Sequence, residues 1–136
     1  MTARPPHRRP RWLPAVAALC WLALPGAGMA PAWAAGTCSP NGTALSIQAF
    51  DSKYDKDCLA APANQGFTID FKNLDRGIPH NVAIYQDDTD SKPFFKGELI
   101  EGPKEITYSV QALPAGTFVF RCDPHPDTMH GTFVVK

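Results

Sequence analysis

The sequence predicts an all-β protein, an antiparallel β-sandwich or barrel built as a single domain. Apolar and polar residues alternate in several short runs, and Pro and Gly turn signals separate those runs. Helical periodicity is almost absent after residue 35. At least six strands at such short spacing are typical of a sandwich or a barrel.

The expected strands follow one another along the chain. Runs 45–50 and 67–71 alternate apolar and polar residues, and the second ends in a turn over 73–77. Runs 80–85, 106–110, 116–121 and 132–135 complete the set. Between residues 86 and 102 the pattern weakens, and Asp87, Asp88 and Asp90 indicate an exposed acidic loop. A calcium site is disfavoured there because the spaced ligands of a calcium loop are missing.

Residues 1–34 have the pattern of a secretory signal peptide. Four arginines between positions 4 and 11 precede an apolar stretch over 13–28, and Ala32-Trp33-Ala34 offers a small-x-small cleavage site. Pro25 and Gly26 interrupt the apolar stretch, which argues against a membrane span. We expect a domain over 35–136, exported to the periplasm or the cell exterior. A twin-arginine signal at Arg8-Arg9 and an uncleaved membrane anchor are the alternatives.

The net charge changes once the signal peptide is set aside. The whole chain carries 13 basic and 13 acidic residues, but four of the basic ones lie in the expected signal. Nine basic and 13 acidic residues remain, which gives a net charge of about −4. This charge disfavours nucleic acid and anionic membrane as partners. The remaining 102 residues are enough for one domain with a modest core.

Three cysteines follow the expected cleavage site, and an odd number leaves one unpaired. Pairing Cys38 with Cys58 leaves Cys122 free for a metal. Such a bridge closes a loop of about 20 residues and stabilises the fold by about 3 kcal/mol on the chain-entropy model. The alternative is that Cys58 is a small buried apolar residue and Cys38 lies in a loose N-terminal segment.

Cys122, His125 and Met129 lie within eight residues, between two expected strands. A thiolate, imidazoles and a weakly bound thioether are the ligands of a mononuclear blue, or type 1, copper site. Such a site needs a second imidazole, and His80 is the candidate. Each residue alone has an ordinary explanation as a buried thiol, a core methionine or a surface histidine, but the combination predicts one copper ion per chain. We expect His130 to be exposed and not a ligand.

The segment that carries these ligands is expected to be rigid. Pro124 and Pro126 flank His125, restrict the backbone and lower the entropy of holding the loop in one shape. A rigid loop suits electron transfer because little rearrangement accompanies the change of oxidation state. Gly131 is expected to allow a tight return into the final strand.

At these residues the chain resembles the cupredoxins, the small blue copper proteins that include plastocyanin, pseudoazurin and amicyanin. The resemblance implies a Greek-key β-sandwich with copper held by His80, Cys122, His125 and axial Met129. It also implies that Asn81 hydrogen-bonds to the cysteine loop and braces it. Three residues separate His125 from Met129, where amicyanin-like loops have two and plastocyanin-like loops have four. The matching motifs are Pro79-His-Asn-Val82, Leu113-Pro-Ala-Gly-Thr-Phe-Val-Phe-Arg-Cys122, Pro124-His-Pro126 and Met129-x-Gly-x-Phe-Val134.

The ligands and the resemblance together predict an exported, monomeric one-electron carrier that works between redox partner proteins. We expect His80 to be buried and His125 to present its ring edge as the exit for the electron, with the acidic loop near Asp87 steering a basic partner. An enzyme is not expected, because further copper centres need more histidines than the three after residue 35. The alternative is a copper-handling protein, a chaperone or carrier that delivers the metal from the same site.

Overall fold

Eleven β-strands form the regular structure of residues 38–136, the part of the chain that this computed structural model describes. The predicted signal peptide over residues 1–34 lies outside the described residues. In chain order the strands are β1 (Ala44–Phe50), β2 (Lys53–Tyr54), β3 (Cys58–Ala61), β4 (Phe67–Asn73), β5 (Pro79–His80), β6 (Ala83–Tyr85), β7 (Phe95–Lys96), β8 (Ile100–Glu101), β9 (Lys104–Val110), β10 (Gly116–Arg121) and β11 (His130–Val135).

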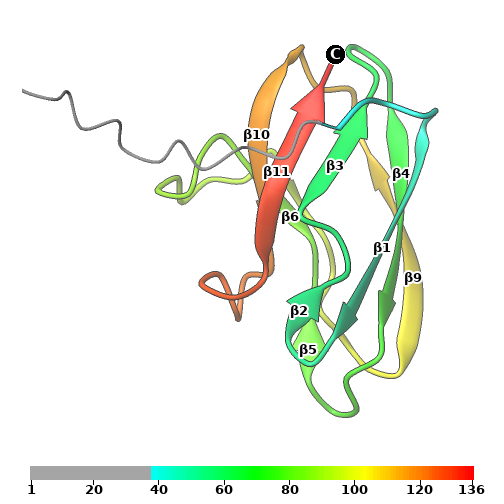
Figure 1. Ribbon diagram of the computed structural model, residues 1–136, viewed down its shortest axis with the longest axis vertical. Helices are drawn as coiled ribbons and strands as arrows, with labels where there is room; N and C mark the ends of the chain where they lie inside the picture. Colours follow the sequence, from blue (N-terminus) through cyan, green and yellow to red (C-terminus); the bar gives the residue numbers. More distant parts are fainter. Residues whose placement is uncertain (1–37) are drawn as a thin grey trace, which may run out of the picture. The chain divides into compact units, whose positions relative to one another are not determined.

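Two sheets face each other as the layers of a sandwich (Figure 1). One sheet has the strand order β2-β1-β4-β9 and the other β3-β11-β10-β6-β7, while β5 and β8 form a separate pair. The chain leaves the first sheet after β2, joins the second as β3, and returns to the first as β4. The predicted Greek-key sandwich is therefore confirmed, and the sheets do not close into a barrel.

Two strand pairs are parallel, although the sequence pattern predicts antiparallel pairing. β1 lies parallel to β4, and β3 lies parallel to β11. A parallel pair needs a crossover that returns the chain to the same end of the sheet. Here β3, in the opposite layer, provides that return between β1 and β4. The pairs β4–β9, β10–β11 and β10–β6 are antiparallel as expected, and β6–β7 is antiparallel as well.

Alternate residues of the long strands form the core between the sheets. In β4, Phe67, Ile69 and Phe71 are buried, and the residues between them are more exposed. From the opposite sheet Phe133 stacks on Phe67 with ring centroids 5.4 Å apart. Burying one such side chain stabilises the fold by roughly 1.5–3 kcal/mol. The period-2 pattern in the sequence therefore identified the faces that pack together.

Four short strands, β2, β3, β7 and β8, were not among the expected runs. β3 has the sequence Cys-Leu-Ala-Ala, which contains no β-branched or aromatic residue. It is a strand because β11 offers a parallel partner with the register Thr132↔Cys58. β2, β7 and β8 have two residues each and exist only through pairing with β1, β6 and β5. Local sequence carries little information about strands that tertiary pairing creates.

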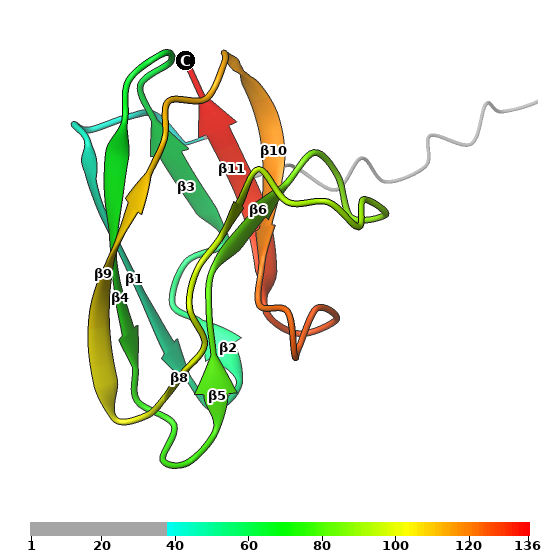
Figure 2. The same ribbon diagram turned by 180° about the vertical axis from the view of Figure 1, so that it is seen from behind.

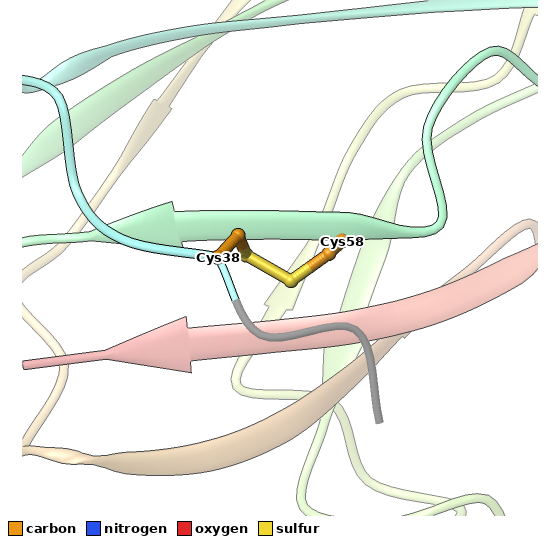
Figure 3. Close-up of a disulfide and its surroundings, with 2 residues drawn as sticks. All are labelled: Cys38 and Cys58. Atoms are coloured by element: carbon orange, nitrogen blue, oxygen red, sulfur yellow. A yellow bond between two sulfur atoms is a disulfide. The ribbon is translucent and has the colours of Figure 1, made fainter. Parts of the chain in front are cut away.

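The predicted disulfide between Cys38 and Cys58 is confirmed (Figure 3). The two alpha carbons are 6.0 Å apart, within the range that a disulfide spans. The bridge ties the segment that precedes β1 to the first residue of β3. Among residues 38–136, Cys122 is left as the free cysteine, and it is buried.

Gly131 is needed for a reason other than the predicted one. It lies inside β11 and pairs with Phe120. A Cβ atom at this position would lie 2.5 Å from the carbonyl oxygen of Asp57 and would overlap the Phe120 ring. Close packing of β11 against its neighbours, rather than turn conformation, therefore requires glycine here.

The short strands β2 and β5 and the loop that follows β10 lie at one end of the sandwich, and the C-terminus lies at the other (Figures 1 and 2). β5 contains His80, and the loop after β10 begins at Cys122. The fold therefore brings together two segments that are about 40 residues apart in the chain.

Candidate metal centre

Cys122 follows directly on β10 and is completely buried. Pairing of β10 with both β6 and β11 sets the position at which the strand ends. The Cys122 N–H donates to the carbonyl oxygen of Met129 at 2.8 Å, which closes the loop over residues 122–129, here called the ligand loop. The sulfur therefore lies at the end of a strand that is paired on both sides.

Backbone hydrogen bonds inside the ligand loop connect the predicted ligand residues to one another. The His125 N–H donates to the Cys122 carbonyl at 3.2 Å, and the Met129 N–H donates to the His125 carbonyl at 2.9 Å. Pro124 and Pro126 lie between the predicted ligand residues in the chain and have no backbone N–H that would need an acceptor. The loop is thus a compact turn in which Cys122, His125 and Met129 hold each other's backbone in place.

His80 reaches the same point from the other side of the sandwich end. It lies in β5, pairs with Ile100 of β8 and is completely buried. Its Nδ1 atom is 3.6 Å from the Cys122 sulfur, and Nδ1 of His125 is 3.7 Å from that sulfur. One ligand atom from each of the three residues lies within 4.8 Å of the others. The structure therefore brings three of the four predicted ligand residues together.

These distances fit a shared metal ion. Bonds of about 2.0 Å to an imidazole nitrogen and about 2.3 Å to a thiolate, meeting at about 110–120°, separate the two atoms by about 3.5–3.7 Å. The observed separations of 3.6 and 3.7 Å match that spacing. The donor set also fits, since a thiolate with two imidazoles suits copper. Met129, the fourth predicted residue, is buried at the end of the ligand loop.

Burial raises the pKa of the Cys122 thiol, although hydrogen bonds from the backbone amides of Asn81 and His125 partly offset this effect. A thiol in such surroundings stays protonated until a cation stabilises the thiolate. Tyr54 is affected in the same way, because burial and then repulsion by the Cys122 sulfur raise the pKa of its hydroxyl. The buried surroundings of the sulfur therefore disfavour a free thiolate, and a bound metal would stabilise it.

Asp75 is a functional candidate that sequence reasoning missed. Its Oδ2 atom lies 2.9 Å from Nε2 of His80, the ring nitrogen that faces away from Cys122. Burial acts to raise the pKa of Asp75, but hydrogen bonds from Ser52, His80 and Asp51 outweigh it and hold that pKa below its usual range. The sequence contained only a weak signal, an acidic residue in the 73–77 turn five positions before His80.

Asn81 joins the two sides of the centre, as the family resemblance implied. Its Oδ1 atom accepts the N–H of Asp123 at 3.0 Å, and its Nδ2 donates to the Asp123 carboxylate at 2.9 Å. Asp123 also accepts the Tyr85 hydroxyl at 2.6 Å and pairs with Lys96 at 3.1 Å. The residue after His80 is thus fastened to the residue after Cys122.

The solvent side of the centre is formed by the ligand loop. His125 is half-buried between the exposed Pro124 and Pro126. His130 is exposed and lies outside the three-residue cluster, as predicted, with Nδ1 2.9 Å from the Pro126 carbonyl. The Arg121 guanidinium donates to the carbonyls of Asp88 and Asp90 and lies 3.8 Å from the centroid of the Tyr85 ring. This arginine fastens the acidic loop beside the ligand loop.

Comparison with known proteins identifies the relatives of this chain. The family model described as a cupredoxin-like domain matches residues 14–135. Plastocyanin B'/B'' of Nicotiana tabacum is 39% identical over 66 residues, and plastocyanin of Sambucus nigra is 38% identical over 66 residues. Each match covers 44% of this chain but only 65% of the plastocyanin.

Solved structures show the same architecture. Auracyanin A of Chloroflexus aurantiacus, described as a "blue" copper protein, aligns with a TM-score of 0.62 at 22% identity, over 71% of this chain and 100% of that one. A reduced amicyanin variant aligns with a TM-score of 0.51 at 28% identity, over 69% of this chain and 83% of the other. At 22% identity, the auracyanin match shows that the two proteins share a fold.

Proposed function

The chain belongs to the cupredoxin-like domain family, and we propose that it is a blue copper protein that carries single electrons between redox partner proteins. The observation that carries this proposal is the convergence of the Cys122 sulfur with the Nδ1 atoms of His80 and His125, at 3.6 and 3.7 Å. Cupredoxin membership supports an electron-carrying role.

In this proposal His80, Cys122 and His125 would hold one copper ion, and Met129 would contribute a weakly bound thioether. Copper supplies a one-electron couple between Cu(II) and Cu(I). Cys122 contributes a thiolate from a buried position, and His80 contributes an imidazole that solvent does not reach. The backbone hydrogen bonds of the ligand loop keep Cys122, His125 and Met129 in one arrangement, so little rearrangement accompanies a change of charge.

His125 is the route by which we expect electrons to enter and leave. Its ring is half-buried, whereas His80 is fully buried, so only the first can approach a partner protein closely. Exposed Pro124 and Pro126 surround it with apolar surface on which a partner can dock. The acidic loop with exposed Asp87 and Asp88 lies beside the ligand loop and is suited to steer a basic partner.

We further propose that residues 1–34 direct export and that the domain acts as a monomer in the periplasm or outside the cell. The Cys38–Cys58 disulfide supports this location, because structural disulfides persist in oxidising compartments. Between Cys38 and Lys136 no helix has the length and apolar character needed to cross a membrane.

Voltammetry of the copper-loaded protein tests the proposed role. We expect a reversible one-electron wave, with copper retained in both oxidation states when a Cu(I)-binding competitor is added in moderate excess. Rapid loss of Cu(I) to the competitor, together with an irreversible wave, would instead favour the alternative role of a copper chaperone or carrier. As a control, a copper-loaded Lys136→Ala variant, altered at an exposed residue at the opposite end of the sandwich, should give the same wave and the same copper retention as the unaltered protein.

A further inference from the structure

The turn between β1 and β2 has an unusual backbone for its sequence. Phe50 pairs with Lys53, so the turn has two residues, Asp51 and Ser52. Both have positive φ angles, 53° and 52°. Two-residue hairpin turns of this kind favour Asn-Gly, because residues with a Cβ atom are strained there. The strain is retained only where surrounding contacts hold the backbone in place.

The contact that holds this turn is the carboxylate of Asp75. The Asp51 N–H donates to its Oδ1 at 2.7 Å and the Ser52 N–H to its Oδ2 at 2.9 Å. Consecutive backbone N–H groups that converge on one anion form a small anion-binding cradle. Asp75 is itself placed by its own N–H, which donates to Oδ1 of Asn73 at 2.9 Å. A strained turn and a buried amide therefore fix the position of one carboxylate.

This carboxylate determines which ring nitrogen of His80 carries a proton. An ionised carboxylate only accepts hydrogen bonds, so Nε2 of His80, 2.9 Å from Oδ2, must be the donor. The proton on Nε2 leaves Nδ1 with a free lone pair, and Nδ1 is the atom that faces the Cys122 sulfur. His80 is fully buried and Asp75 is 8% exposed, so water does not compete for this bond.

We propose that Asp75, held by the amides of the Asp51–Ser52 turn, is a positioning residue that fixes His80 as the Nε2-protonated tautomer and presents Nδ1 to the copper. This inference rests on the proposed copper-binding function. Mutating the residue that accepts a hydrogen bond from the second ring nitrogen of a metal-binding histidine typically lowers metal affinity about ten- to a hundredfold. A fixed negative charge next to a ligand also favours Cu(II) over Cu(I), so Asp75 is expected to lower the reduction potential.

The first test needs no metal. Nitrogen-15 NMR of the histidine rings in the metal-free protein at pH 8, where an ordinary histidine is neutral, reports the tautomer of His80 directly. We expect a proton on Nε2 and none on Nδ1 in the unaltered protein. In Asp75→Asn we expect a mixture of tautomers, while Asp75→Glu retains the carboxylate and most of the Nε2-protonated form. A proton on Nδ1 of the unaltered protein would overturn the proposal.

The second test measures copper binding. Asp75→Asn is expected to lose about ten- to a hundredfold in Cu(II) affinity and to shift the reduction potential to a more positive value. Asp70→Asn removes the same charge from an exposed position on β4, where the side chain accepts the Thr107 hydroxyl, and serves as the control. Equal affinities and potentials in Asp75→Asn and Asp70→Asn would overturn the proposal.

The two tests separate this proposal from the proposed function. If the unaltered protein binds no copper through Cys122, the proposed function fails, and the NMR measurement still decides whether Asp75 sets the tautomer of His80. If copper binds but the tautomer does not depend on residue 75, the function stands and the positioning role fails.

Discussion

His80 and the ligand loop bring metal-binding atoms to one point, but different kinds of contact position them. The residues of the ligand loop are held by backbone hydrogen bonds to one another, over at most seven positions in the chain. His80 is held by side chains and turns from distant segments, through Asp75 to Asp51 and Ser52, and through pairing of β5 with β8. The ligand loop therefore closes mainly on itself, with Asn81 tying it to the rest of the fold through Asp123, whereas the position of His80 depends on contacts with distant segments.

This difference explains which parts of the centre the sequence revealed. Cys122, His125 and Met129 lie within one short segment, so their spacing alone indicated a metal site. His80 was found because a second imidazole was needed and because Pro79-His-Asn-Val82 resembles the family motif. Asp75 was not found, since nothing local marks a carboxylate whose role arises from a turn 23 and 24 positions earlier in the chain.

The strands of the fold also differ in how far local sequence determines them. Long alternating runs such as Phe67–Asn73 predicted their strands and buried faces, because the period of 2 reflects burial on one side. Pairing direction was less predictable, and the parallel pairs β1–β4 and β3–β11 depend on how the chain crosses between the layers. The disulfide was predictable from cysteine number, and its geometry was not.

The largest effect on stability is expected from a substitution on the His80 side of the centre. Asn73 is fully buried, donates to the carbonyls of Ile78 and Ile100 at 2.8 and 2.7 Å, and accepts the Asp75 N–H. Asn73→Ala leaves these buried groups without partners, so we expect a loss of about 3–4 kcal/mol in unfolding free energy, measured by urea denaturation. Thr107→Val, at an exposed side-chain hydrogen bond, is the control and should cost less than about 1 kcal/mol. A similar loss in both variants would mean that the buried hydrogen bonds of Asn73 stabilise the protein no more than an exposed one.

A change away from both sides of the centre should affect stability alone. Replacing Cys38 and Cys58 by alanine removes the disulfide, which is expected to lower the unfolding free energy by about 3 kcal/mol. Because the bridge connects the segment before β1 to β3 and not to the ligand residues, copper binding should be unchanged in the folded double variant. If the fully folded double variant bound copper more weakly than the unaltered protein in a competition titration, the disulfide and the metal centre would be coupled.

The smallest expected effect lies on the ligand-loop side. Pro126→Ala increases the conformational freedom of the unfolded chain, so we expect a loss of at most about 1 kcal/mol in unfolding free energy. The backbone hydrogen bonds that join Cys122, His125 and Met129 do not involve the side chain of Pro126 and should persist. A loss comparable to that of Asn73→Ala, in the same denaturation experiment, would mean that the loop depends on its prolines rather than on those hydrogen bonds.

The visible absorption spectrum of the protein after addition of Cu(II), measured beside Cys122→Ser, tests the central claim most directly. The convergence of a buried sulfur and two imidazole nitrogens predicts an intense sulfur-to-copper charge-transfer band that colours the protein blue or green and is absent from the variant. A colourless protein that is folded and contains bound copper would contradict the claim, because Cys122 would then not be a ligand of Cu(II).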